Sequence, residues 1–567
     1  MDQIPVPVPL PVLSLDSAKR QINTIKEIWN QFNQKTLKFS TNVTLIGSCV
    51  TVRKGKAGKM LFIELLDGST VKTLQCICDS APDELTDKRY SVNWEPLFDH
   101  CYRGATVELS GTIESSPAVG QPIEFVVTSF KCLGKIKEPE KYFLGQRGFI
   151  NRDILRQIPH QRGHTQLFTA IQIIKQVGYQ ALHEAMAMMG IGEIQPTTIS
   201  SNECEDGAHP FTISTLFDNK DCKTVPVKED GSFDWSQDFF GKRVYLTVSS
   251  QLHLEATTLS CKRDSYCLTN AFRAEPSTSP AHLAEFIMPE WEIIGGGLIR
   301  NMSIAQTLLK HIFTKVLDNC MDELLYLESY RHQDDDVWYS GEKASLKELR
   351  KDVKAKKITK EELETKTQVV ETEYSRRKGL PSIIDRLSKY RDQAFAITTH
   401  EECVRMMLEH VATGKVKFDV IPGYEDDLTR QHEYYISEVL FGGLPTFIRY
   451  FPKKIKAFYM PVIKEDTVAS RMGIQHVEGY DLIFPYTGEV VGGSQRIHDE
   501  DELVSRMTEL GMNLDELAWY IQLRRDASLP HGGAGLGLGR LFMVMTGILN
   551  NKDMQEFPRG AGLKCFA

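Results

Sequence analysis

The feature that most constrains the fold is a change of hydrophobic period along the chain. Between residues 40 and 135, apolar and polar residues alternate in five runs, at 43–46, 60–65, 73–78, 105–109 and 123–127. A period of two puts one face of a β-strand in a core, and turns rich in Gly, Asp and Ser separate the runs. Five short strands in under 100 residues predict a small antiparallel barrel, for which an OB-fold is the natural candidate.

The chain of 567 residues is too long for one hydrophobic core, so several domains are expected. Residues 1–38 are predicted to be a Pro-rich arm and a helix, and residues 39–136 the barrel. A polar hinge at 137–165 leads into an α+β domain at 166–567. Residues 16–37 place Ile25, Ile28, Trp29 and Phe32 on one helical face, which favours a helix packed on its own protein over a contact with a partner.

Charge and composition exclude some classes of protein. The net charge is −8, which argues against a protein that coats nucleic acid, although local basic patches can still bind phosphates. A charged segment at about 330–395, with nine Lys/Arg and six Asp/Glu within 342–366, predicts an inserted helical hairpin. No apolar stretch is long enough for a membrane span, and the twelve scattered cysteines indicate reduced thiols in the cytoplasm.

Two distant segments carry the chemistry. Residues 272–286 read FRAEPSTSPAHLAEF, which predicts a hairpin with Arg273 at the end of one strand and His282 and Glu285 on the returning strand. An Arg fork suits a nucleotide phosphate. Residues 531–541 alternate Gly with small apolar residues and reach Arg540, so that the backbone can approach a base or phosphate closely. Each segment alone is a weak signal, but the pair is specific.

The two segments, with Pro196 closing a helix–strand unit, resemble motifs 2, 3 and 1 of the class II aminoacyl-tRNA synthetases. With the barrel in front, the chain is similar to the aspartyl/asparaginyl/lysyl subgroup. The resemblance implies a catalytic domain with a central antiparallel sheet flanked by helices. It also implies ATP and Mg²⁺, an anticodon-binding barrel and a homodimer.

The resemblance assigns roles to matching residues. Arg273 matches the Arg at the ATP α-phosphate and the substrate carboxylate, and Arg540 and His282 match residues at the γ-phosphate. The remaining expected site residues are Glu275 and Phe286 at adenine; Asp481 and Glu489 as Mg²⁺ ligands; Arg496 at the substrate side-chain oxygen; Glu205, Gln251 and Glu290 in the amino-acid cradle; and Arg53, Phe62, Gln75 and Glu124 at the anticodon.

Blocks at 246–255, 450–460 and 488–496 resemble the asparaginyl branch, which implies asparagine and tRNA(Asn) as substrates. The aspartyl branch usually carries a Lys where this chain has Leu254, and Glu255 follows. A carboxylate repels aspartate, whereas an amide offers hydrogen-bond donors, so Glu255 is expected to select asparagine. An aspartate-specific or dual-specific enzyme remains the alternative.

The chain departs from the family pattern in the motif 2 turn and in motif 3. Pro276 and Pro280 replace polar residues, Ala281 stands where an Arg normally precedes the His, and Gly539 replaces the acidic residue before the motif 3 Arg. These departures favour a non-catalytic tRNA-binding protein derived from a synthetase, and an asparagine-forming, amidotransferase-like paralogue is a further alternative. The phosphate- and metal-binding residues that remain favour the enzyme.

Overall fold

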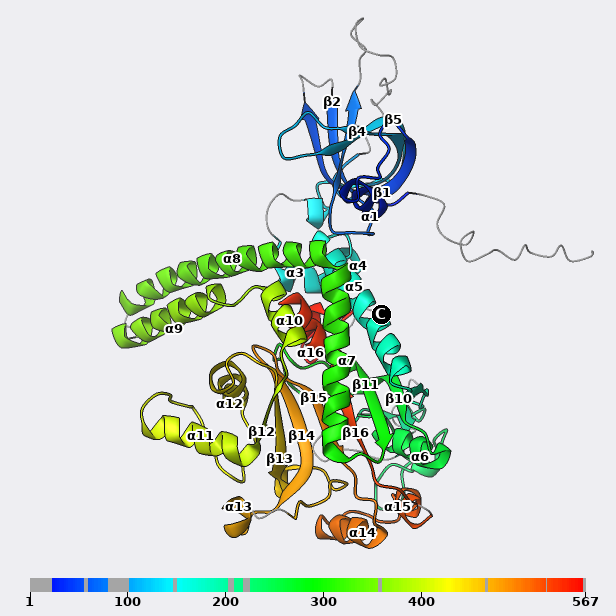
Figure 1. The fold of residues 1–567 in the computed structure, drawn as a ribbon, viewed down its shortest axis with the longest axis vertical. Coiled ribbons are helices and arrows are strands. Elements are labelled where there is room, and N and C mark those ends of the chain that lie inside the picture. The colour runs from blue at the N-terminus through cyan, green and yellow to red at the C-terminus, as the bar shows by residue number, and fades with distance from the viewer. Residues whose placement is uncertain are drawn as a thin grey trace, which may run out of the picture. The chain divides into compact units, whose positions relative to one another are not determined.

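The computed structural model describes residues 23–55, 60–79, 101–145, 150–201, 209–217, 225–354, 359–464, 468–526 and 528–563. The chain divides into two compact units (Figure 1). The first comprises Met1–Ile150 and Gln161–Ile173, and the second Asn151–His160 and Ile174–Ala567. The Pro-rich arm and Glu205 lie outside the described residues.

The first unit is a closed barrel of five strands in the order β1-β2-β3-β5-β4. The strands are β1 (Asn42–Gly55), β2 (Met60–Leu66), β3 (Leu74–Asp79), β4 (Thr106–Ser115) and β5 (Ile123–Gly134). All neighbours are antiparallel except β3 and β5, which run parallel. The five alternating runs thus form an OB-like barrel, as predicted, because every inward-facing apolar residue finds a core once the sheet closes.

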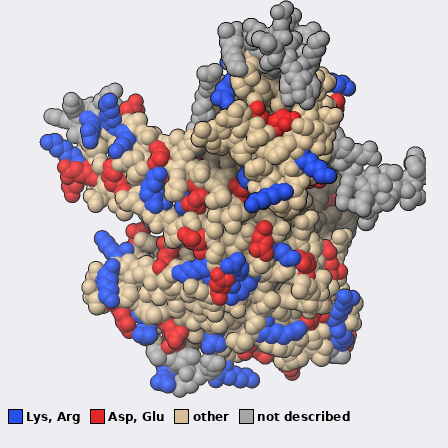
Figure 2. Space-filling view, turned by 45° about the horizontal axis from the view of Figure 1, so that its top comes forward, with Lys and Arg blue, Asp and Glu red and all other residues tan. Residues whose placement is uncertain are grey.

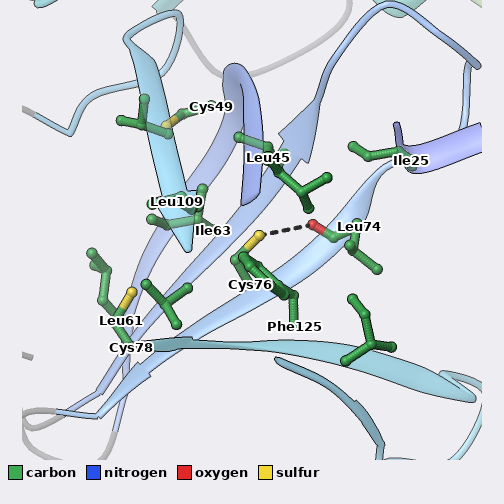
Figure 3. Close-up of a cluster of buried hydrophobic side chains, with 14 of the residues drawn as sticks. Ile25, Leu45, Cys49, Leu61, Ile63, Leu74, Cys76, Cys78, Leu109 and Phe125 are labelled. Atoms are coloured by element: carbon green, nitrogen blue, oxygen red, sulfur yellow. Dashed lines mark hydrogen bonds between the residues drawn. The ribbon is translucent and has the colours of Figure 1, made fainter. Parts of the chain in front are cut away.

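The barrel interior is a single apolar cluster (Figure 3). Leu45, Leu109 and Phe125 come from three different strands and are fully buried. Helix α1 (Ile25–Asn33) adds the buried side chain of Ile25 to the same cluster, and its first turn is held by a hydrogen bond from Ile25 N to Asp67 Oδ2 of 2.8 Å. The helix therefore packs on its own barrel, as its apolar face predicted.

The second unit is built on an eight-stranded sheet in the order β12-β13-β14-β15-β16-β11-β10-β6. The six central strands are antiparallel, and β12 and β6 join the two edges in parallel. The strands are β6 (Gly192–Glu193), β10 (Ser265–Phe272), β11 (Glu285–Ile294), β12 (Ala396–Thr399), β13 (Thr446–Pro452), β14 (His476–Phe484), β15 (Gly488–Gln495) and β16 (His531–Leu536). A separate small sheet contains β7 (Ile199–Ser200), β8 (Thr212–Ile213) and β9 (Val244–Leu246).

Helices flank this sheet, as expected for the α+β class. Helix α7 packs lengthwise along β14, β15 and β16 (Figure 1), while α6 contacts β10 and β11 and α16 contacts β11 and β15. No helix in the described parts of the chain is both long and apolar enough to cross a membrane. The helices of this unit, including α5 which begins in the first unit, are α3 (Arg152–Gln157), α5 (Gln166–Met188), α6 (Gln251–Cys261), α7 (Gly297–Asn319), α8 (Met321–Lys354), α9 (Lys360–Lys378), α10 (Ile383–Asp392), α11 (His400–Ala412), α12 (Arg430–Tyr434), α13 (Val468–Arg471), α14 (Glu500–Glu509), α15 (Ala518–Arg525) and α16 (Leu538–Thr546).

The charged segment forms two long helices, α8 and α9, that lie side by side (Figure 1). Tyr339 and Tyr374 stack between them with ring centroids 3.8 Å apart, and the Arg377 guanidinium lies 4.2 Å from the Trp338 ring. On the face shown in Figure 2, basic and acidic side chains are interspersed and form no patch of one sign. Stacked rings and a cation–π contact thus join the two helices, and Leu346 of α8 and Val370 of α9 are buried apolar residues.

Gly111 in β4 tests the tightness of the barrel, because a Cβ there would lie 2.0 Å from Val126 O. Gly111→Ala is expected to destabilise the barrel by roughly 1–3 kcal/mol, since the backbone of β5 would have to move. Urea unfolding followed by circular dichroism measures the change. Gly134→Ala is the matched control, because its Cβ would meet Thr106 at an ordinary 3.7 Å. Equal stability of the two variants would contradict the prediction.

Candidate active site

One face of strand β11 lines a trough in the second unit. Phe286, Met288, Glu290 and Glu292 alternate along β11 and therefore point to the same side of the sheet. Three of them, Met288, Glu290 and Glu292, line a cavity of about 410 Å³, and Phe286 and Met288 line a neighbouring cavity of about 140 Å³. A single strand thus runs beneath both cavities.

The glycine-rich run forms strand β16, which lies between β11 and β15. Gly533 is opposite Glu292, and a Cβ on it would lie 2.0 Å from Glu292 Oε2 and 2.3 Å from Trp291 O. The prediction that these glycines make room for a ligand is therefore wrong at Gly533, where the chain's own carboxylate fills the space. Gly535 and Gly537 do line the cavities.

At one end of the larger cavity, Arg496 and Glu292 form a two-point ion pair. Arg496 Nε donates to Glu292 Oε1 at 3.2 Å and Nη2 donates to Oε2 at 3.0 Å, while Nη1 donates to Ser494 Oγ. Both charged side chains are almost fully buried. Burial raises the pKa of Glu292, and the charge of Arg496 opposes that rise. Burial lowers the pKa of Arg496, but the charge of Glu292 raises it above its ordinary value. The guanidinium thus stays charged, and its neighbour largely neutralises it.

Glu255 lies behind this pair and does not line the cavity, which differs from its expected contact with substrate. Its carboxylate is completely buried and accepts from Arg524 Nη2 and Tyr520 Oη at 2.7 Å each, with His531 Nε2 at 3.1 Å. Burial raises the pKa of Glu255, but Arg524 and His531 together hold it below its ordinary value. The carboxylate that lines the cavity directly beside Arg496 is Glu292, which the sequence had not singled out.

Gln251 and Glu290 line the same cavity, in accord with their expected place in an amino-acid cradle. Ser249 Oγ donates to Glu290 Oε1, and Ser250 N donates to Oε2 at 2.8 Å, so the carboxylate is fixed by the segment that begins α6. Gln251 Nε2 donates to Glu255 Oε1 at 2.9 Å. Hydrogen bonds from a hydroxyl group and a backbone N–H thus fix the orientation of the Glu290 carboxylate at the cavity.

The two arginines from distant segments converge. Arg273 directly follows β10, and Arg540 lies in the first turn of α16, yet both line the smaller cavity together with Glu275, His282 and Phe286. The Arg273 guanidinium lies 5.5 Å from the Phe286 ring. Arg273 and Glu489 also line the larger cavity, so the two cavities adjoin at these residues. The predicted hairpin forms, with His282 in its turn rather than on the returning strand.

The turn holds His282 by two serines. His282 Nδ1 lies 3.0 Å from Ser277 Oγ and 2.5 Å from Ser279 Oγ. Burial lowers the pKa of His282; Glu275 opposes this shift, and Arg540, Arg430 and Arg273 add to it. Arg273 and Arg540 line the smaller cavity beside this imidazole, and guanidinium groups suit the oxygens of a polyphosphate.

Asp481 and Glu489 flank Gly492, and a basic side chain already contacts one carboxylate oxygen of each. Lys456 Nζ donates to Asp481 Oδ2 at 2.8 Å, and Arg540 Nη1 lies 3.4 Å from Glu489 Oε2. Burial raises the pKa of Asp481 to about 6 despite Lys456. Burial alone would raise the pKa of Glu489, but the nearby Arg540, Lys456 and Arg273 together lower it below its ordinary value. Glu489 is therefore the carboxylate that stays ionised most readily.

The remaining oxygens of this pair suit a hard cation. A Cβ at Gly492 would lie 3.0 Å from Glu489 Oε1 and 3.7 Å from Asp481 Oδ1, so the glycine keeps the space between the two oxygens open. Within the described residues, no group of three or more His, Cys, Asp or Glu side chains is arranged to hold a metal alone. A Mg²⁺ ion here would need further oxygen ligands, which phosphate groups supply.

Glu292, Lys456 and Glu433 are charged groups at the site that were not predicted. Glu292 stands two residues after Glu290, so the strand period could have revealed it. Lys456 stands in a block noted for its resemblance, without a role. Glu433, in α12, has its Oε2 2.5 Å from where a Cβ of Gly488 would be, and burial together with Glu489 raises its pKa to about 8. Only the fold brings Glu433 to β15.

The four expected anticodon residues lie on the outer surface of the barrel. Phe62, Gln75 and Glu124 alternate with buried neighbours on β2, β3 and β5, so Phe62 is not a core residue. Arg53 is the cross-strand partner of Phe62. Gln75 and Glu124 each stand one residue before the paired Cys76 and Phe125. The barrel therefore presents an aromatic ring, a cation and two groups with hydrogen-bonding capacity on adjacent strands.

An OB-like barrel, a mostly antiparallel sheet and two arginines meeting at one cavity define a class II aminoacyl-tRNA synthetase. A family model described as tRNA synthetases class II (D, K and N) matches residues 164–561. The chain belongs to this family, and it is therefore an aminoacyl-tRNA synthetase, a ligase that uses ATP.

Curated relatives match nearly the whole chain. An asparagine–tRNA ligase of Borrelia garinii is 31% identical over 520 residues, which cover 92% of this chain and 96% of that protein. A chloroplastic/mitochondrial asparagine–tRNA ligase of Arabidopsis thaliana is 30% identical over 94% of this chain and 82% of its own length. The asparaginyl-tRNA synthetase of Pyrococcus horikoshii, solved with asparaginyl-adenylate, has the same fold, with a TM-score of 0.68, 21% identity and coverage of 93% of this chain and 96% of that chain.

The cluster behind Arg496 predicts a large effect at one of two adjacent arginines. Arg524→Met is expected to destabilise the second unit by about 3–5 kcal/mol, because Glu255 keeps its charge without its closest partner. Chemical denaturation at neutral pH measures the loss. Arg525→Met is the control, since Arg525 is exposed and pairs with Glu500 at the surface, so little change is expected. A stable Arg524→Met protein would show that the cluster is not a unit.

Proposed function

We propose that this chain is an asparagine–tRNA ligase, which activates asparagine with ATP and transfers it to tRNA(Asn). One observation carries the proposal: a continuous pair of cavities has two converging arginines at one end and the Arg496–Glu292 pair at the other. The arginines suit the phosphates of ATP. The ion pair suits a small polar side chain that both accepts and donates hydrogen bonds.

The amide of asparagine fits the Arg496–Glu292 pair better than a carboxylate does. Its oxygen accepts from the Arg496 guanidinium, and its NH₂ group donates to a Glu292 oxygen. Aspartate offers no donor, and its charge would face Glu292 and, behind it, Glu255, which lies 3.7 Å from Arg496 Nε. Selection by a site built for a donor is strong, because the wrong substrate leaves a buried polar group unpaired. Glu290, Gln251 and, outside the described residues, Glu205 would receive the α-ammonium group.

In the first step, the asparagine carboxylate attacks the α-phosphorus of ATP, an oxygen–phosphorus bond forms, and pyrophosphate leaves. Arg273 lies where the two cavities adjoin, so it can hold the carboxylate and the α-phosphate together. Phe286 provides a face for adenine, with Glu275 nearby, and Arg540 and His282 bind the departing phosphates. Fixed positive groups stabilise the charge that develops, and no protein nucleophile is required.

Asp481 and Glu489 would hold Mg²⁺ through the oxygens beside Gly492, with Lys456 and Arg540 fixing their other oxygens. When bound, the ion supplies charge neutralisation to phosphate oxygens. The side chain of Glu489 keeps 41% of its surface accessible through the cavity, so it can receive a ligand that enters with the nucleotide.

In the second step, a hydroxyl of the terminal adenosine of the tRNA attacks the activated carbonyl carbon, an ester forms, and AMP leaves. The barrel would identify the tRNA: Phe62 stacks an anticodon base, Gln75 and Glu124 read base edges, and Arg53 contacts the backbone. A homodimer and a cytoplasmic location are proposed from the resemblance to class II enzymes. The exposed Phe239 and Phe240, on a segment between motifs 1 and 2, support burial against a second copy.

ATP–pyrophosphate exchange with each of the twenty amino acids tests this function. Exchange is expected with asparagine, and Arg273→Ala should reduce it by at least a thousandfold, because the α-phosphate and the carboxylate lose their shared cation. Arg300→Ala, at an exposed ion pair with Asp264, is the control. Exchange with aspartate would favour the aspartate-specific or dual-specific enzyme. No exchange with any amino acid would favour a non-catalytic tRNA-binding protein.

Phe62→Ala tests the barrel separately. Loss of one stacked base corresponds to about 1–3 kcal/mol, so the KM for tRNA should rise roughly tenfold to a hundredfold while amino-acid-dependent exchange is unchanged. Aminoacylation with purified tRNA(Asn) measures the effect. Val119→Ala, a fully exposed residue in the β4–β5 connection, should leave charging unaltered. An unchanged KM in Phe62→Ala would remove Phe62 from the tRNA interface.

A further inference from the structure

Two departures from the family pattern meet at a third residue. Where the family has an Arg and an acidic residue, this chain has Ala281 in the motif 2 turn and Gly539 in α16. Asn551 contacts both: its Nδ2 donates to Ala281 O at 3.1 Å, and its Oδ1 lies 2.1 Å from where a Cβ of Gly539 would be. The side chain of Asn551 thus occupies the space that an acidic residue at 539 would enter.

The orientation of the Asn551 amide is fixed by its neighbours. The Ala281 carbonyl can only accept, so the NH₂ group must face it and Oδ1 must face Gly539. Asn551 is 5% exposed, and its Oδ1 has no hydrogen-bond partner within the described chain. A buried amide that leaves its oxygen unpaired is retained at a cost, which is consistent with a role at the cavity.

The segment that carries Asn551 also holds the motif 2 turn. Asn551 N donates to Pro280 O at 2.8 Å, and Lys552 Nζ donates to Thr278 O at 2.9 Å. The segment is itself anchored, since Asp553 accepts from Arg152 Nη1 at 2.9 Å and from Arg156 Nε at 2.7 Å. With the bond to Ala281, three carbonyl groups of the turn are bound by one short, fixed stretch of chain.

Asn551 lines the smaller cavity together with His282 and Arg540. We propose that Asn551 is a positioning residue for ATP. Its side chain fixes the motif 2 turn, which carries His282, against helix α16, which carries Arg540. It does so by hydrogen bonds to the turn, in place of an oppositely charged pair at positions 281 and 539. The inference rests on the proposed binding of ATP at this cavity.

The first test compares Asn551→Ala with Asn319→Ala, an exposed asparagine at the end of α7. In pyrophosphate exchange, Asn551→Ala should raise the KM for ATP about tenfold or more, because His282 and Arg540 are no longer held at a fixed separation. The KM for asparagine and the melting temperature should change little. A merely structural residue would not act on ATP alone. Equal changes in the KM for ATP and the KM for asparagine, or no change in either, would therefore overturn the proposal.

The second test asks whether combined substitutions at positions 281, 539 and 551 restore a KM for ATP that the single substitutions impair. Gly539→Glu alone should be deleterious, because its Cβ collides with Asn551 Oδ1. In the triple variant A281R/G539E/N551A the collision is gone and an ion pair can form, so the KM for ATP should return to within about threefold of the original value. A triple variant worse than Asn551→Ala, with an unchanged melting temperature, would show that Asn551 does not replace such a pair.

Calorimetric titration of ATP separates this proposal from the proposed function. If the unmodified protein binds ATP but shows no exchange, the proposed function fails, and the same variants can still be compared by their Kd for ATP. Weaker ATP binding by Asn551→Ala alone would then support the positioning role. If ATP does not bind the unmodified protein, both proposals fail.

Discussion

The catalytic unit depends on a carboxylate buried against an arginine in the middle of its sheet. Glu292 lies on β11 and Arg496 directly follows β15, and Gly533, on β16 between these two strands, leaves room for Glu292 Oε2 to reach the guanidinium. Glu255, Arg524 and His531 form a second buried polar layer behind the pair. Removing one partner from such a network leaves an uncompensated charge, so these residues hold one another in place.

This arrangement also sets the geometry of the site. Because β11 carries Phe286, Met288, Glu290 and Glu292 on one face, the proposed place for a nucleotide base and the proposed place for a side-chain amide lie along a single rigid strand. Arg273 enters from the preceding strand and Arg540 from a helix that starts just after β16. Reacting groups held by rigid elements need little reorganisation, which is how a site without a protein nucleophile can work.

Several parts of the site were accessible from the sequence because they are local. The barrel followed from alternation of apolar residues, and the hairpin with Arg273, His282 and Phe286 followed from a contiguous motif. Residues whose role depends on distant partners were harder to place. Glu255 was expected at the substrate, but Arg524, His531 and Tyr520, all more than 260 residues away, surround it and bury it. Glu433 and Asn551 were not predicted, since nothing in their own segments marks them.

By itself, the sequence determined the classes of its two units and the residue types at the nucleotide end, because hydrophobic period and short motifs act over neighbouring residues. Only the tertiary structure decided which carboxylate pairs with Arg496 at the cavity and what the glycines of β16 make room for. It also decided which side chain fills the space beside Gly539. These outcomes depend on strand register and on packing between segments hundreds of residues apart, and a one-residue shift in register would reverse the face on which each side chain lies.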